Sequence, residues 1–170
     1  SVDSSLVDEW EAAGAVEDTA PPTEADAVVR DRRGLTVLVR NALFRRVRLA
    51  AADKVEELAD VDMEWGFGVR KWQEALDAFY EAHEEILLDA DARSSAYLVI
   101  DEADERANHV WHVRQIFHDA DGDSDFGIAA DVDLDATQDV GEVVFSNYRV
   151  GFTEDILDYS AVLRRKGVRL

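Results

Sequence analysis

The chain has 170 residues, of which 18 are basic and 38 acidic, so its formal net charge is −20 at neutral pH. This length corresponds to one domain with a sizeable core, and four tryptophans and seven phenylalanines exclude wholesale disorder. The absence of cysteine excludes a disulfide scaffold and a cysteine-based zinc site. No apolar run is long enough to cross a bilayer, so we expect no membrane partner. The absence of cysteine and of a visible signal peptide makes a cytoplasmic location the expectation.

The N-terminal part predicts a helical arm followed by a linker. A short helix is expected within residues 1–14, and residues 14–26 hold both prolines among acidic and small residues. We therefore divide the chain into an arm and linker over residues 1–22 and a second domain over residues 23–170. The first residue is Ser1 and not methionine, which fits either removal of the initiator methionine or a fragment of a longer protein, and we favour the fragment.

Helices are predicted in the first half of that second domain. Apolar residues at three- and four-residue spacing predict a helix over residues 24–59, with Thr23 as its N-cap and a potential break at Gly34. A loop is expected over residues 59–68, and a second helix over residues 69–88.

The second half predicts strands. Alternating patterns favour strands at residues 96–101, 109–118, 126–135 and 142–152, and a last helix follows from Thr153. Helices followed by an antiparallel meander indicate an α+β fold, in which helices cover one face of a curved sheet of about four strands. We expect a cone-like sheet, as in cystatin-like and nuclear-transport-factor-like folds. The fourth strand would be an edge or pair with a partner, and a homodimer is a further expectation.

The turn between the second and third predicted strands is rich in aspartate. In HDADGDSD (118–125) the aspartates alternate, and their oxygens suit calcium. An EF-hand loop needs glycine at its sixth position, and counting back from Gly122 places Phe117 at the first, so the register fails. The sequence therefore favours a solvated hairpin turn.

The four histidines do not predict a metal site. His112 and His118 share a predicted strand face but lie about 20 Å apart along it at ~3.3 Å per residue. We therefore assign no metal ligand, and regard the histidines as ordinary surface or half-buried residues. A general acid–base pair of His109 with Asp101 rests only on their proximity in the predicted fold.

A cone-shaped sheet can enclose a pocket for a small molecule. Its predicted lining consists of Tyr97, Trp111, Gln115 and Tyr148. Packed core is the default use of such residues, so a binding or enzymatic pocket is an alternative and not the preferred interpretation.

Positive charge is concentrated between Arg30 and Lys54. This segment holds eight basic and two acidic residues. Its arginines have three interpretations: contact with phosphates, docking on another acidic surface, or pairing with the chain's own carboxylates. The residues chosen for a nucleic-acid or partner contact are Arg40, Arg45, Arg46 and Arg48.

The sequence contains none of the common catalytic motifs: no phosphate-binding GxxxxGK[ST] loop, no GxSxG and no HExxH. We therefore assign no catalytic residue and no cofactor to this chain.

Several strings in order carry a family resemblance. They are SSLVDEWE (4–11), VLVRNALFRRVRLAA (37–51), WQEALDAFYEAHEEI (72–86), DARSSAYLVID (91–101), WHVRQIF (111–117) and FGIAADVDLD (126–135). Together they resemble the C-terminal domain of unknown function that follows the motor in actinobacterial DEAD/DEAH-box superfamily II helicases. The resemblance runs from about Ser4 to about Val150.

This resemblance implies that the chain is a non-catalytic accessory domain of an ATP-dependent helicase. ATP and magnesium would then be bound by the helicase core in the same polypeptide. The domain would position the motor, a nucleic acid or a protein partner. A protein-interaction or dimerisation module is the remaining alternative.

Overall fold

The computed structural model describes residues 28–156. The predicted arm, its linker, the boundary between residues 22 and 23 and the cap at Thr23 lie outside this range. Of the predicted last helix, α8 (Thr153–Ile156) falls within it.

In the described part of the region where one long helix is predicted, residues 28–30 are helical, Asp31 interrupts the helix, and two further helices follow. They are α3 (Arg32–Ala51) and α4 (Val55–Asp62). Asp31 caps α3 by accepting a hydrogen bond from the Gly34 amide at 2.9 Å, and Gly34 stays inside the helix. The break falls instead at Asp53, whose φ of 55° is incompatible with a continuing right-handed helix. The prediction of one helix over 24–59 is therefore wrong.

The predicted loop over residues 59–68 is also largely helical. Helix α4 continues to Asp62, a 3-10 helix (η2) covers Met63–Trp65, and the turn ends at Gly66 with φ 80°. Helix α5 (Val69–Ala82) then ends earlier than predicted, because His83 takes up an extended conformation.

The sheet confirms the predicted antiparallel meander. Its strands are β1 (Leu98–Asp101), β2 (Val110–Ile116), β3 (Phe126–Asp133) and β4 (Phe145–Phe152), in the spatial order β1-β2-β3-β4. A side chain at Gly127 would collide with the backbone of Gln115, so glycine is required where β3 approaches β2 this closely. The α+β class is thereby established.

Short helices replace three of the irregular connections. They are η3 (Asp91–Arg93), α6 (Glu105–Asn108) and α7 (Leu134–Val140). Helix α7 occupies residues predicted partly as strand and partly as turn. It begins where Asp133 accepts a hydrogen bond from the Ala136 amide at 3.0 Å.

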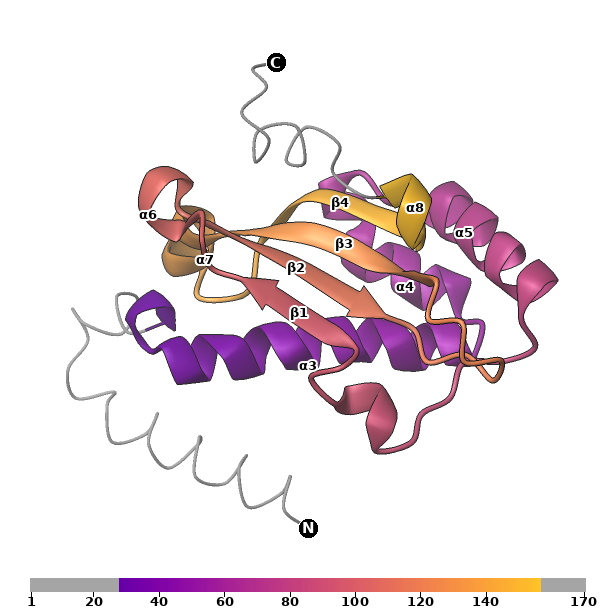
Figure 1. Cartoon of the computed structure of the whole chain (residues 1–170). Coiled ribbons are helices and arrows are strands. Elements are labelled where there is room, and N and C mark those ends of the chain that lie inside the picture. The colour runs from indigo at the N-terminus through magenta and orange to yellow at the C-terminus, as the bar shows by residue number, and fades with distance from the viewer. Residues whose placement is uncertain (1–27, 157–170) are drawn as a thin grey trace, which may run out of the picture.

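Helices α3, α4 and α5 lie together on one side of the sheet, and α6 and α7 lie at one end of it (Figure 1). The alternating apolar residues of the predicted second and third strands are buried on one side, although Leu134 belongs to α7 in the structure. These residues are Trp111, Val113 and Phe117 beside Phe126, Ile128, Ala130, Val132 and Leu134. No helix in residues 28–156 combines the length and apolarity that crossing a bilayer would need. The likeness to cystatin-like and nuclear-transport-factor-like folds stays a prediction.

A buried carboxylate connects the helices. Asp62 is fully buried at the end of α4 and accepts hydrogen bonds from Arg46 (Nε, 3.0 Å; Nη2, 2.9 Å), Trp65 (Nε1, 2.7 Å) and Trp72 (Nε1, 2.9 Å). We call these four residues the buried carboxylate network. It joins α3, α4, η2 and α5, and burial without such donors would be costly for a carboxylate.

We predict that Asp62→Asn lowers the free energy of unfolding by about 3–5 kcal/mol, because it leaves the Arg46 guanidinium buried without its counter-charge. Urea unfolding measures this change. Asp60→Asn, on an exposed position of the same helix, is the control and should stay within about 0.5 kcal/mol of wild type. Equal stability of the two variants would contradict the role given to the network.

A second polar group, centred on His112, connects β2 to β3 and to the segment before α6. His112 on β2 lies between Asp131 of β3 (Nδ1 to Oδ1, 2.6 Å) and Asp104 before α6 (Nε2 to Oδ2, 3.0 Å). Burial lowers the pKa of His112, but the hydrogen bonds and charges of Asp131 and Asp104 outweigh it, and the pKa is raised. The imidazolium is therefore more stable in the folded chain than in the unfolded one.

The raised pKa of His112 predicts a pH-dependent contribution to stability. This contribution is complete below the unfolded pKa of about 6.5 and disappears as pH rises through the higher folded pKa. The difference in unfolding free energy between wild type and His112→Gln should thus be larger at pH 6 than at pH 9 in urea titrations. His109→Gln serves as control, because its ion pair with Asp135 is exposed and screened by water. A difference that grows with pH would contradict this assignment.

Candidate functional site

The exposed side of α3 carries a row of arginines. At about 100° per residue, Arg33, Arg40 and Arg48 fall within about 80° of one another, and Arg45 lies beside them. All four are exposed. Arg40 and Arg48 are about 12 Å apart along the axis at ~1.5 Å per residue. We call these four residues the arginine face.

The arginine face is not neutralised by the carboxylates of the described chain. Within residues 28–156, Arg32, Arg46 and Lys54 of the basic segment form ion pairs. The four arginines of the face make none there. The interpretation that the segment pairs with the chain's own acids therefore applies to those three residues and not to the arginine face.

Phe44 orders part of this surface. Its ring lies under two guanidinium groups, with Arg48 Cζ at 5.5 Å and Arg93 Cζ at 4.8 Å from the ring centroid. Arg93 comes from η3 and also contacts Asn41 of α3 at 3.4 Å. The cation–π contact holds the planar guanidinium group of Arg48 in place and leaves its N–H edge for other acceptors.

Arg46 is not part of this surface. Its side chain is buried against Asp62, and its Nη1 donates to the Ala42 carbonyl at 2.7 Å. The prediction that Arg46 contacts a partner is wrong. Its helical position is the signal that excludes it, because Arg46 follows Leu43 by three residues and precedes Ala50 by four, on the buried stripe.

Three of the four predicted pocket residues are buried in the packed core, and the fourth, Tyr97, packs against another side chain. Trp111, Gln115 and Tyr148 are buried, and Trp111 donates to Glu105 at 2.7 Å while Gln115 donates to the Tyr97 carbonyl at 3.1 Å. The Tyr97 ring lies 4.8 Å from the His118 ring. The interior behind these strands is filled by side chains, so the prediction of a pocket lined by these four residues is wrong.

Tyr148 carries a buried hydroxyl that makes no hydrogen bond to any residue in the described part of the chain. It lies close enough to Asp62 and Arg46 for their charges to act on it. Burial, with the negative charge of Asp62, raises the pKa of Tyr148 well above its ordinary value. The neutral phenol is therefore a structural part of the core.

A surface hollow of about 640 Å³ lies elsewhere, beside α6 and α7. Its wall includes Arg32, held by Glu102 at 2.8 Å and by Glu105 at 2.5 Å. His109 lines the same hollow and contacts Asp135 at 3.1 Å. The predicted pairing of His109 with Asp101 is not formed, since Asp101 accepts from the Ala103 amide instead.

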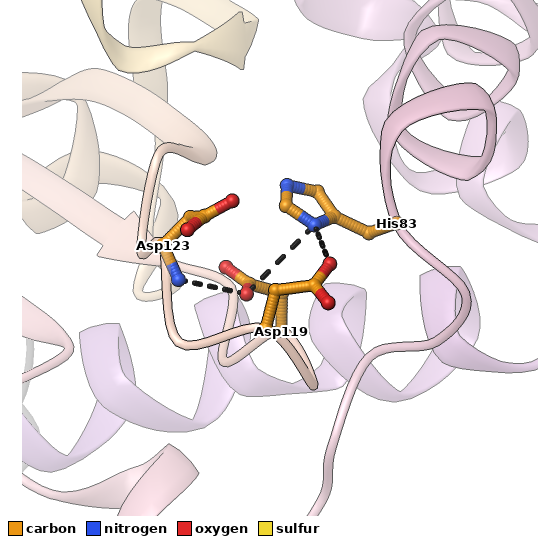
Figure 2. Close-up of side chains that lie close together, drawn as sticks. His83, Asp119 and Asp123 are labelled. Carbon is orange, nitrogen blue, oxygen red and sulfur yellow. Dashed lines mark hydrogen bonds and ion pairs between the residues drawn. The ribbon is translucent and has the colours of Figure 1, made fainter.

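The loop between β2 and β3 brings aspartates to His83. We call residues 119–125 the aspartate loop. Asp119 is buried and accepts from the amides of Asp123 (2.9 Å) and Ser124 (2.8 Å), which folds the loop around it. His83, in the segment after α5, extends toward this loop from the opposite side (Figure 2).

His83 is surrounded by carboxylates. Its Nδ1 lies 2.8 Å from Asp121 Oδ2 and 3.8 Å from Asp119 Oδ1, and its Nε2 lies 2.9 Å from Asp125 Oδ1. Burial lowers the pKa of His83, but the hydrogen bonds to Asp121 and Asp125 and the charge of Asp119 outweigh it, and the pKa is raised. The arrangement therefore favours a positive charge on the imidazole or beside it.

Sequence reasoning does not find this cluster. The alternating aspartates predict a turn correctly, but His83 is separated from them by more than thirty residues and joins them only through the packing of α5 against the sheet. Four ligating groups have donor atoms within 4.8 Å of one another: His83, Asp119, Asp121 and Asp123.

Comparison with known families identifies one match. A family model described as a domain of unknown function, DUF3516, matches residues 1–150. Neither the curated proteins nor the solved structures that were compared with the chain give a match. Because the matched region covers most of the sequence, the chain belongs to the DUF3516 family, a domain of unknown function.

Proposed function

We propose that this chain is a non-catalytic accessory domain of an ATP-dependent superfamily II helicase, and that its arginine face contacts nucleic acid. The helicase part rests on the ordered sequence strings that resemble the domain following the motor of such enzymes. ATP and magnesium would be bound by the motor, outside these residues.

The observation that carries the nucleic-acid part is the exposed row of arginines on α3. In a chain with 38 acidic residues, these guanidinium groups remain without an ion pair in residues 28–156. Arginine forms bidentate hydrogen bonds with phosphate, and the row extends along the helix far enough to meet several phosphates. Such contacts supply affinity without base specificity, which suits a domain that supports a motor.

The other expected roles have less support. The filled interior behind the sheet removes the basis for a small-molecule pocket there. Homodimerisation through the edge strand β4 stays a prediction, since no contact between copies supports it.

Fluorescence anisotropy of the full 170-residue chain with labelled single- and double-stranded DNA and RNA tests the arginine face. We expect affinity that falls with salt between 50 and 200 mM. The variant Arg40→Ala/Arg45→Ala/Arg48→Ala should bind more weakly. Its plot of log K against log salt should be shallower by about 0.7–0.9 for each phosphate that the variant no longer neutralises.

A charge-matched control separates the effect of the arginine face on affinity from the effect of the net charge. Arg70→Ala/Lys71→Ala/Arg106→Ala also removes three positive charges, from exposed positions on α5 and α6. This variant should keep most of the affinity. An equal decrease in both variants, or no salt-dependent binding to any of the four nucleic acids, would overturn the nucleic-acid part and leave a protein surface as the partner.

The helicase part is tested by the complete open reading frame. A helicase motor encoded upstream of this chain in the same frame is the expected result. A frame that encodes no motor would overturn that part and leave the test of the arginine face unaffected.

A further inference from the structure

The cluster of His83 with the aspartate loop lies apart from the arginine face, and the proposed function does not use it. His83 is 4% exposed and Asp119 is 1% exposed, so both are withdrawn from bulk water. Asp121 and Asp123 complete the group from exposed positions of the loop. A buried carboxylate and a buried imidazole beside further carboxylates are stabilised by positive charge, which either a protonated imidazole or a bound cation supplies.

Both ring nitrogens of His83 face a carboxylate. Nε2 lies 2.9 Å from Asp125 Oδ1 and Nδ1 lies 2.8 Å from Asp121 Oδ2, so a protonated imidazole donates to both and a neutral one to only one of them. When the neutral imidazole carries its proton on Nε2 and donates to Asp125, Nδ1 presents a lone pair to Asp119 and Asp121, which as carboxylates have no proton to donate. A ligating histidine that donates its other N–H to a carboxylate is the usual support of a protein metal site.

The distance from His83 Nδ1 to Asp119 suits a shared ion, whereas the 2.8 Å distance to Asp121 Oδ2 is that of a hydrogen bond, which an ion would replace. The 3.8 Å separation from Asp119 Oδ1 is too long for a hydrogen bond. Two ligands that each lie about 2.0–2.2 Å from one metal ion are about 3–4 Å apart. Each Asp119 oxygen accepts one backbone amide and keeps a second lone pair for an ion.

We propose that His83 Nδ1 and the carboxylates of Asp119, Asp121 and Asp123 bind one divalent transition-metal ion, with Asp125 as the carboxylate that orients the imidazole. The ion joins the segment after α5 to the aspartate loop, two parts of the chain that are distant in sequence. A nitrogen ligand among oxygen ligands favours Zn²⁺ or Mn²⁺ over Ca²⁺ and Mg²⁺, which prefer oxygen.

Calorimetric titration of the metal-stripped 170-residue chain with ZnCl₂ or MnCl₂ tests the site. We expect one ion per chain for at least one of the two, together with a thermal unfolding midpoint that rises with its concentration. CaCl₂ and MgCl₂ should bind at least about tenfold more weakly. Zn²⁺ should also shift the imidazole NMR resonances of His83 more than those of the other three histidines.

Variants are chosen to leave the fold intact. Asp121→Asn and Asp123→Asn change exposed ligands and should abolish one-to-one binding, while Asp125→Asn should weaken it about 10–100-fold through the orientation of His83. Asp139→Asn, an exposed position on α7 at the other end of the sheet, is the matched control and should bind like wild type (Figure 1).

Two results would overturn the proposal. One is the absence of one-to-one binding by either ion, which would mean that a protonated His83 alone supplies the positive charge. The other is weak binding of several ions that Asp139→Asn reduces as much as Asp121→Asn, which would mean non-specific attraction to an acidic surface.

Discussion

The carboxylate of Asp62 fixes how the helices of this domain meet. It is fully buried, and its two oxygens accept from Arg46, Trp65 and Trp72. A buried carboxylate with hydrogen-bond donors around it tolerates little displacement. If any donor moves away, the desolvation of the charge is no longer compensated and the fold is destabilised. Together with the apolar core, this one side chain therefore restricts the rotation of α3 about its axis and the angle between α4 and α5.

The rotation of α3 in turn decides which arginines reach solvent. Arg45 and Arg46 are adjacent in sequence, yet about 100° of helical turn separates them. Arg46 points to Asp62 and the ring of Phe145, whose centroid lies 5.3 Å from its guanidinium carbon, while Arg45 stays exposed. The same ion pair that buries one arginine thus presents the others as a continuous face.

Local sequence patterns predict the sheet well. Alternation places Trp111, Val113 and Gln115 on one side of β2, and all three are buried. The helix boundaries are less predictable, because they depend on contacts between distant residues. Asp53 ends α3 through a left-handed backbone conformation that aspartate tolerates but does not require, and α5 ends at Ala82 where His83 turns toward the aspartate loop.

The candidate sites likewise divide into features that local sequence predicts and features that depend on contacts between distant residues. Charge alone identifies Arg40, Arg45 and Arg48 as an exposed group, and helical spacing is sufficient to exclude Arg46. The predicted pocket fails because the inward side chains of the sheet, among them Trp111, Phe117 and Tyr148, are buried in the packed core. No sequence spacing relates His83 to Asp119, since tertiary packing alone brings them together.

The net charge of −20 opposes a role at nucleic acid when the chain is considered as a whole, but the range of that opposition is limited. At physiological ionic strength the screening length is about 8 Å, so exposed charges farther away contribute little at a given point on the surface. Arg33, Arg40 and Arg48 extend over more than about 20 Å of α3 at ~1.5 Å per residue. The electrostatic potential at a phosphate beside them is therefore determined mainly by these arginines. The remaining acidic surface would instead repel nucleic acid that approaches from other directions, and the domain would then bind in one orientation only.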